Sequence, residues 1–311
     1  MPPATHWIVG PGAMGRLIAL RLADQVPVTL IGRRRLPARQ TLVTPEGDTR
    51  IAPLALERID ALPADIPTMV HLTTKAHGSE AAHAALAAAL PDGVPLVLWQ
   101  NGFACQPRLT EQHRGPVLCA STTEGAHVQG DDRVTHAGHG QTFLGALDGR
   151  HARLASSLAQ TLSAAGLPAE AVDNIHVRLW RKLAVNAAIN PLVAQFAIRN
   201  GQLRDRPFRP MVERLIAEVA ATLTAEGITP PGGGGLEGWR KLVWQVVEAT
   251  ATNRASMLQD VQAGRLTEHE AILAPLLAAA SRHRLSVPCL AWHLHDLRRR
   301  AAALAEPPAA C

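Results

Sequence analysis

Long apolar runs and paired cysteines are both lacking in this 311-residue chain. No uninterrupted stretch of about 18 apolar residues occurs, which predicts that the chain does not span a membrane. The start of the chain lacks the charged and apolar regions of a secretion signal. The cysteines form no CxxC pair, which argues against a zinc site and a disulfide framework: Cys105, Cys119, Cys289 and Cys311. We therefore expect a cytoplasmic protein without bound metal.

Aromatic residues make up only 3% of the chain, and their scarcity bears on its partners. The formal net charge is +5, which can indicate binding to nucleic acid or to a membrane surface. The basic residues are scattered, however, except for Arg33–Arg35 and Arg298–Arg300, and no nucleic-acid-binding motif accompanies them. We expect an anionic small molecule as partner, rather than nucleic acid or a membrane.

Lysine is rare, occurring only at Lys75, Lys182 and Lys241, while the other 28 basic residues are arginine. Arginine does not readily give up its proton, whereas lysine can. A retained lysine therefore indicates a position where a proton is transferred. Chance retention is the alternative, and we expect it to hold for at least one of the three.

The first half of the chain alternates strand and helix patterns, which predicts a parallel sheet with helices on both faces. Residues 116–147 are expected to complete this sheet with strands and turns. The second half has helical periodicity, with helices expected at 174–198, 208–226, 237–263, 267–284 and 289–304. The fold class is therefore α/β, with a Rossmann-type domain over 1–170, an all-α domain over 171–305 and a tail over 306–311.

A glycine-rich motif directly follows the first predicted strand and opens the first helix. It has the G-x-G-x-x-G pattern of a dinucleotide-binding loop, in which backbone N–H groups approach the pyrophosphate: Gly10, Pro11, Gly12, Ala13, Met14 and Gly15. A glycine-rich turn without a ligand is the alternative. The second strand ends at Gly32 and is followed by Arg33, where an NAD site usually has a carboxylate. We therefore expect NADP(H), with Arg33 binding the 2′-phosphate, unless these arginines form a solvated loop.

Two polar clusters occur among the predicted helices. Lys182, Asn186 and Asn190 follow at intervals of four, so a helix presents them on one face about 80° wide. Either they line a cleft, or backbone and neighbouring loops satisfy them. Asn253 and Ser256 are expected on one face of the 237–263 helix. Glu268 is expected in the first turn of the next helix, with Thr267 as its cap.

Five stretches together resemble the ketopantoate reductase family. They match it in order and spacing from residue 7 to about 290: GPGAMG, TTKA around Lys75, QNG around Asn101, WRKLAVNAAINPL around Lys182, and ASMLQDV with TEHEAI around Ser256 and Glu268. The resemblance implies an NADPH-dependent reduction of 2-dehydropantoate to pantoate, in pantothenate and coenzyme A biosynthesis.

The resemblance also implies a role for each residue of the two clusters. Lys182 would be the general acid that protonates the carbonyl oxygen, and Glu268 would orient the lysine and the substrate. Lys75 would lie beside the cofactor, and Asn101 would contact cofactor, substrate and lysine. The remaining polar residues would bind the substrate: Asn186, Asn190, Asn253 and Ser256.

Hydride transfer from nicotinamide needs no metal, and we expect the histidine pairs His136/His139 and His293/His295 to be structural.

Two other functions stay open: a reductase of another small 2-oxo acid on the same scaffold, and a non-catalytic NADPH-binding sensor. A homodimer is slightly favoured.

Overall fold

The chain divides into two units, of which the first comprises residues 1–100 and 105–178 and the second 101–104 and 179–311. A computed structural model describes residues 5–305, so the predicted tail 306–311 lies outside the described residues. The predicted boundary near residue 170 precedes helix α5 (Ile175–Phe196), whose first turn belongs to the first unit. There Ile175 is fully buried, and the guanidinium of Arg178 lies 3.6 Å from the centre of the Phe143 ring.

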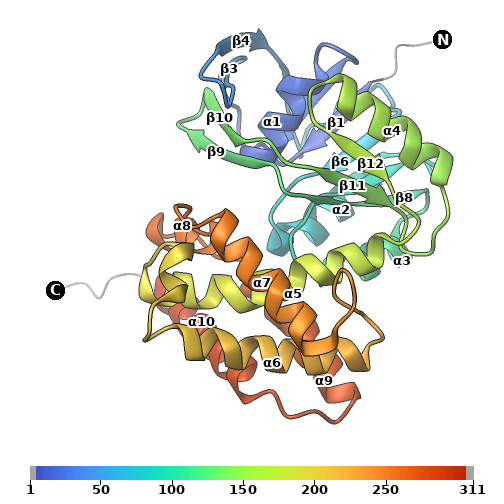
Figure 1. Ribbon diagram of the computed structural model, residues 1–311. Coiled ribbons are helices and arrows are strands. Elements are labelled where there is room, and N and C mark those ends of the chain that lie inside the picture. Colours follow the sequence, from blue (N-terminus) through green and yellow to red (C-terminus); the bar gives the residue numbers. More distant parts are fainter. Residues whose placement is uncertain (1–4, 306–311) are drawn as a thin grey trace. The chain divides into compact units, whose positions relative to one another are not determined.

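An eight-stranded sheet is the centre of the first unit (Figure 1). Its strand order is β12-β11-β8-β7-β6-β1-β2-β5, and all neighbouring strands are parallel except β8 and β11. Strand order reverses at β1, with β2 on one side and β6 on the other, as in doubly wound nucleotide-binding sheets. The predicted fold class is confirmed. The strands are β1 (His6–Val9), β2 (Val28–Gly32), β5 (Ala55–Arg58), β6 (Met69–Leu72), β7 (Leu96–Leu98), β8 (Val117–Thr122), β11 (Thr142–Gly145) and β12 (Ala169–Ala171).

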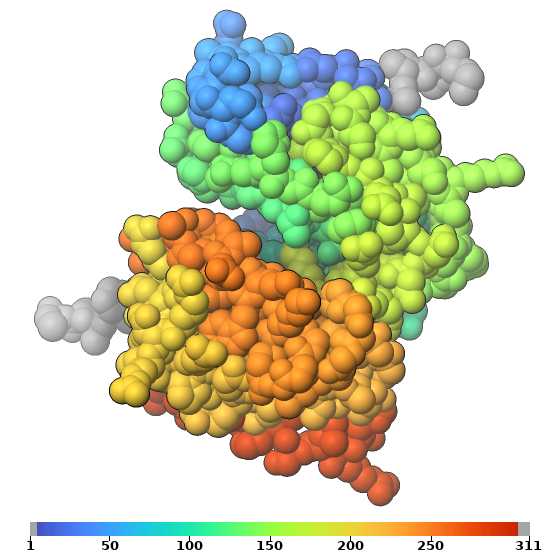
Figure 2. All heavy atoms as spheres, viewed as in Figure 1, coloured from blue at the N-terminus to red at the C-terminus, as the bar shows by residue number. Residues whose placement is uncertain are grey.

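A second sheet, with strand order β4-β3-β10-β9, was not expected. Its strands are β3 (Arg39–Val43), β4 (Thr49–Pro53), β9 (Gly125–Gln129) and β10 (Arg133–Gly138). The prediction that residues 116–147 complete the main sheet is therefore wrong for β9 and β10, because β10 pairs with β3 instead. The blue atoms of β3 and β4 and the green atoms of β9 and β10 lie side by side on the surface of this unit (Figure 2).

Helix α1 (Ala13–Leu22) packs against both sheets, through β1 and β2 of the first and β3, β9 and β10 of the second. Most of its apolar side chains are consequently inaccessible to solvent: Leu17, Ile18, Ala19, Leu20 and Leu22 are all 0% exposed. The other helices of the unit are α2 (Ala76–Ala89), α3 (Cys105–Gln112) and α4 (Ala152–Ala164).

Two arginines of α1 connect it to the second sheet. Arg16 donates from Nε to the Pro11 carbonyl and from Nη1 to the Gly130 carbonyl, each at 3.0 Å. Arg21 donates to Nδ1 of buried His136 at 3.0 Å, so that ring carries its proton on Nε2 and donates to Glu124 at 2.6 Å. His136, expected to be structural, therefore joins α1 to a carboxylate that the sequence spacing did not reveal.

In the described part of the second unit, the helices are α5 from Leu179 onward, α6 (Arg209–Ala225), α7 (Gly235–Ala249), α8 (Ser256–Gln262), α9 (His269–Arg282) and α10 (Pro288–Ala305), with a 3-10 turn at Asn200–Arg204. Their apolar faces meet in a core that excludes solvent; Leu183, Leu192, Leu215, Leu273 and Leu290 are all 0% exposed. Between residues 5 and 305, no helix combines the length and apolarity needed to cross a bilayer.

The single helix predicted over 237–263 is wrong, because residues 250–255 separate α7 from α8. Thr250, the residue at the end of α7, donates both its backbone N–H, at 3.0 Å, and its hydroxyl, at 2.6 Å, to the Val246 carbonyl. The Asn253 and Ala251 carbonyls accept the backbone N–H groups of Asn200 and Gly201. Hydrogen bonds to a distant segment thus replace the expected helical ones.

Three buried aromatic side chains contact one another across the main sheet: His6 of β1, His71 of β6 and Trp99, which directly follows β7. Trp99 donates from its indole N–H to Nδ1 of His71 at 3.2 Å. His71 must then carry its proton on Nε2, which lies 3.1 Å from Nδ1 of His6. Burial lowers the pKa of His6 to about 4 and that of His71 well below its ordinary value. Both rings are therefore neutral in the native state.

Acid should destabilise the first unit through His6 and His71. Below about pH 6.5 these histidines bind protons in the unfolded chain but not in the folded form. The free energy of unfolding is therefore undiminished by them above that pH, and it decreases as the pH falls toward 4. His6 alone accounts for about 2 kcal/mol at pH 5. We expect His6→Asn to have a smaller fall in Tm between pH 7 and pH 5 than the unmodified protein. His77→Asn, at an exposed position on α2, is the control and should retain the full fall.

Candidate active site

The glycine-rich loop follows β1 at the carboxyl edge of the main sheet, at the point where strand order reverses. A Cβ atom at Gly10 would lie 2.5 Å from the Thr74 backbone nitrogen, and one at Gly15 would lie 2.1 Å from the Gly10 carbonyl oxygen. Thr73 donates its hydroxyl to the Gly10 carbonyl at 2.8 Å. The loop is therefore packed against the residues just before Lys75, which stands exposed at the start of α2.

Gly12 differs from these two glycines, because a Cβ atom there would meet nothing within 4 Å. Gly12 is exposed, and it is the N-cap of α1 without a side-chain hydrogen bond to the first turn. The N-terminal N–H groups of a helix and its dipole together attract an anion. Open space above Gly12 fits the backbone approach of a dinucleotide pyrophosphate, so the residues Gly10 to Gly15 are suited to hold such a cofactor.

Arginines follow strand β2 directly, as the sequence indicates. Arg33 and Arg34 are both exposed, and Arg34 forms two hydrogen bonds of 2.5 Å with the Asp131 carboxylate. No carboxylate occurs between Gly32 and Arg35. Among the described residues, no group of three or more histidine, cysteine, aspartate or glutamate side chains is placed to hold a metal ion.

The segment Asn101–Ala104 belongs to the helical unit, although the residues on both sides of it belong to the first unit. The Phe103 N–H donates to the Ala271 carbonyl at 3.0 Å, and the Phe103 ring packs 5.1 Å from that of Trp180. Gly102 has φ +85°, and a Cβ atom there would lie 2.1 Å from the Ala271 carbonyl oxygen. Only glycine fits this contact, which holds Asn101 beside α5 and α9.

Asn101 joins the two ionisable side chains that the sequence singled out. Lys182 donates from Nζ to Asn101 Oδ1 at 2.8 Å, and Asn101 donates from Nδ2 to Glu268 Oε2 at 3.2 Å. Burial lowers the pKa of Lys182 to about 8, and the negative charge of Glu268 opposes that effect. The ammonium group can therefore exchange a proton near neutral pH.

The predicted substrate residues lie in different surroundings. Asn186 and Asn190 share helix α5 with Lys182; Asn186 is half-buried and Asn190 is buried. Asn253 and Ser256 do not share a helix, because Asn253 lies in the 250–255 connection and Ser256 begins α8. Both are exposed.

Glu268 itself is the N-cap residue of α9, and no side chain makes a capping hydrogen bond there. The predicted cap at Thr267 is wrong, because its hydroxyl pairs with Nδ1 of His269 at 2.8 Å. Glu268 is 7% exposed, so this carboxylate is more enclosed than a helix-start residue on the surface would be.

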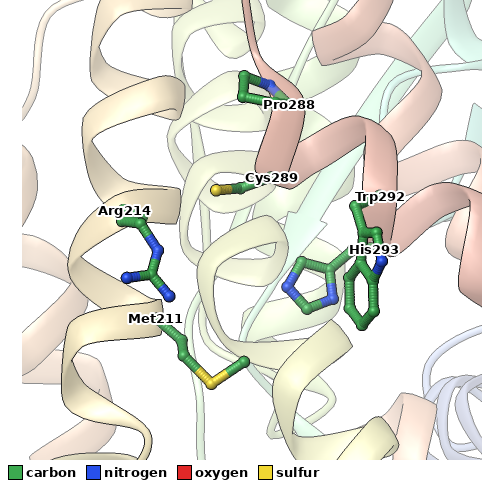
Figure 3. Close-up of a pocket in the computed structure, with 6 residues that line it drawn as sticks. All are labelled: Met211, Arg214, Pro288, Cys289, Trp292 and His293. Atoms are coloured by element: carbon green, nitrogen blue, oxygen red, sulfur yellow. The ribbon is translucent and has the colours of Figure 1, made fainter.

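A pocket of about 300 Å³ opens between α6 and α10, away from these residues (Figure 3). Its lining is Met211, Arg214, Pro288, Cys289, Trp292 and His293. Glu218 accepts the first N–H groups of α10, from Cys289 and Leu290, at 2.8 Å each. Burial lowers the pKa of His293 to about 4, so its ring is neutral. Lys182, Asn101 and Glu268 are not among the residues that line this pocket.

The structural roles of Gly102, Phe103 and Arg16 were not predicted from the sequence. The glycine that follows Asn101 was a detectable signal, because glycine often marks a close backbone approach. The other two had none: the partners of Phe103, Trp180 and Ala271, are more than 70 residues away, and Arg16 bonds across the fold to Gly130.

The glycine-rich loop at the strand-order reversal is that of a Rossmann-type dinucleotide-binding domain. Two family models cover most of it: "Ketopantoate reductase PanE/ApbA" matches residues 7–149, and "Ketopantoate reductase PanE/ApbA C terminal" matches residues 174–299. The chain belongs to the ketopantoate reductase family.

Known proteins resemble the chain over nearly its whole length. The 2-dehydropantoate 2-reductase of Vibrio cholerae is 33% identical over 287 residues, covering 90% of this chain and 92% of that protein. The ternary structure of D-mandelate dehydrogenase with NADH and anilino(oxo)acetate has a TM-score of 0.86 at 22% identity, covering 97% of this chain and 100% of that one. A dimeric ketopantoate reductase from Staphylococcus aureus has a TM-score of 0.82 at 21% identity, covering 96% and 99%. The two structures show the shared fold.

Replacing Gly102 with alanine should displace Asn101, because the added methyl group would overlap the Ala271 carbonyl. We expect kcat for reduction to fall about 10²-fold, the effect of misplacing a reacting group by about 1 Å. Gly47→Ala is the matched control: Gly47 has a similar φ of +94° but open space around its Cβ position. It should lose stability without losing activity. Equal kcat in the two variants would contradict the positioning role of Gly102.

Proposed function

We propose that this protein reduces 2-dehydropantoate to pantoate with NADPH, the reaction by which pantoate is made for pantothenate and coenzyme A. The observation that carries the proposal is the line of hydrogen bonds from the Lys182 ammonium through Asn101 to the Glu268 carboxylate. The reaction named for the Vibrio cholerae relative supports the choice of substrate.

Lys182 is the general acid of the proposed reaction. The cofactor, when bound, would supply the hydride for the 2-oxo carbon, so negative charge would develop on the carbonyl oxygen. Lys182 donates a proton from Nζ to that oxygen, which becomes the hydroxyl group of the product. Because burial lowers its pKa to about 8, the ammonium group is mostly protonated at neutral pH and yet gives up its proton readily.

Glu268 and Asn101 prepare the lysine for this step. The Asn101 amide accepts from the ammonium group with its oxygen and donates to the carboxylate with its nitrogen, which fixes the direction of the Nζ group. The negative charge of Glu268 favours the protonated form of Lys182. Without that charge, desolvation would lower the pKa of Lys182 further, and a smaller fraction of the lysine would be protonated and able to act as an acid.

Asn186 and Asn190 present amide groups on the same helix as the lysine, and we assign them to the hydroxyl and carboxylate groups of the substrate. Asn253, in the 250–255 connection, and Ser256, at the start of α8, are both exposed and are assigned to the same ligand. For the cofactor, residues Gly10 to Gly15 would hold the pyrophosphate, Arg33 the 2′-phosphate, and Lys75 and Asn101 neighbouring groups.

Reduction of another small 2-oxo acid on the same scaffold is the main alternative, and a substrate panel followed by NADPH absorbance separates the two. 2-Dehydropantoate should give the highest kcat/KM. Tight NADPH binding without turnover of any 2-oxo acid would instead favour a sensor. A homodimer and a cytoplasmic location remain predictions.

Lys182→Ala should lose turnover by about 10² to 10⁴-fold, the usual contribution of a general acid. NADPH binding, measured by fluorescence titration, should change little, because the glycine-rich loop lies in the other unit. Lys241→Ala is the matched control, since Lys241 is an exposed lysine on α7 of the same unit. It should keep full turnover. Near-normal turnover in Lys182→Ala would refute the proposed mechanism.

Glu268→Gln should move the alkaline limb of the kcat profile to lower pH. In the unmodified enzyme we expect kcat to fall as the pH rises through about 8, where Lys182 loses its proton. Removing the Glu268 charge lowers the pKa of Lys182 further, so the fall begins earlier. Glu270→Gln removes an exposed charge two residues away and should leave the profile unchanged. An unshifted limb in Glu268→Gln would count against electrostatic support by this carboxylate.

A further inference from the structure

Three consecutive arginines follow β2, and they differ in their hydrogen-bond partners. Arg34 is paired with the Asp131 carboxylate through two parallel hydrogen bonds of 2.5 Å. This hydrogen-bonded guanidinium lowers the pKa of Asp131 below its usual range, so the carboxylate is ionised at neutral pH. Arg33 is exposed, and its guanidinium has no comparable bidentate partner among the hydrogen bonds seen in residues 5–305.

Asp131 comes from a distant part of the chain, the turn between β9 and β10, and that turn is fixed in place. Its Gly130 carbonyl accepts from Arg16 Nη1, while Nε of the same guanidinium donates to Pro11 in the glycine-rich loop. The Asp131 carbonyl accepts from Gln40 Nε2 at 2.9 Å, and Gln40 is fully buried. The Asp132 carbonyl accepts from the Thr41 N–H at 2.7 Å. A rigid turn thus presents a carboxylate at the end of β2.

We propose that Asp131 is a specificity-determining residue that limits the preference for NADPH over NADH by occupying Arg34. The inference rests on the proposed use of NADPH. In Rossmann-type sites the group at the end of the second strand contacts the 2′ position of the adenosine ribose, which carries the phosphate only in NADPH. Asp131 acts there in two ways: it competes with the 2′-phosphate for the guanidinium of Arg34, and its own charge repels that phosphate.

Asp131→Asn removes both effects without changing the size of the side chain. The expected result is an about fivefold lower Kd for NADPH, in the range of one exposed charge pair, while Kd for NADH changes less than about twofold. The gain should shrink at high ionic strength, because salt screens interactions between exposed charges. Both affinities are measured by fluorescence titration of the full-length protein, together with 2′,5′-ADP and 5′-AMP as competing ligands that differ by the same phosphate.

Asp132→Asn is the matched control, because Asp132 is the neighbouring exposed carboxylate in the same turn. It removes one negative charge but not the pairing with Arg34, and should change the ratio of the two Kd values less than Asp131→Asn does. A double-mutant cycle with Arg34→Ala tests whether Asp131 acts through Arg34. The effect of Asp131→Asn on the ratio of the two Kd values should largely vanish when Arg34 is absent. An equal effect of both aspartate substitutions, or one that persists in Arg34→Ala, would overturn the inference.

Arg33→Ala separates this inference from the proposed function. If Arg33→Ala weakens NADPH binding and spares NADH while Asp131→Asn leaves the ratio unchanged, only the role of Asp131 is refuted. If the unmodified protein binds both cofactors equally and Arg33→Ala has no effect, the NADPH assignment itself fails. The Tm of Asp131→Asn shows whether the turn keeps its structure. A displaced turn would lower Tm and weaken the binding of both cofactors alike, whereas the proposed effect leaves Tm unchanged.

Discussion

A single amide group, that of Asn101, connects the ammonium group of Lys182 to the carboxylate of Glu268. Asn101 accepts a hydrogen bond from one and donates to the other, so neither charge is left without a partner as water is removed. Desolvation of a charged lysine is costly and lowers its pKa, while the nearby carboxylate limits that effect. The balance keeps a proton available near neutral pH, and the packing of Gly102 and Phe103 on α9 and α5 maintains it.

The sequence revealed those parts of the fold and site whose signals are local. The glycine-rich loop was identifiable because its turn must admit close backbone contacts at Gly10 and Gly15, and the structure has them. The row containing Lys182 was identifiable because helical periodicity survives burial: α5 runs without interruption through all three polar residues. Its link to Asn101 and Glu268 was suggested by the resemblance to a family rather than by periodicity.

What could not be predicted depends on contacts between distant segments. Helix propensity favoured one helix through residue 250, but hydrogen bonds from Asn200 and Gly201 hold the backbone of 251–253 in another conformation. Strands β9 and β10 have ordinary strand composition, and only the pairing of β10 with β3 directs them into a second sheet. Likewise, no local pattern pairs His136 with Glu124 or Arg34 with Asp131.

The assignment of Asn101–Ala104 to the helical unit has a consequence for dissecting this enzyme. The polypeptide passes from one unit to the other after Gln100, after Ala104 and again after Arg178, so neither unit is a continuous stretch of chain. A fragment beginning at Leu179 would contain the lysine and the glutamate but not the asparagine that bridges them. A helical fragment made by a single cut near Arg178 would therefore lack the hydrogen bonds that join Lys182 and Glu268 through Asn101. Studying that unit alone would require adding residues 101–104 back to it.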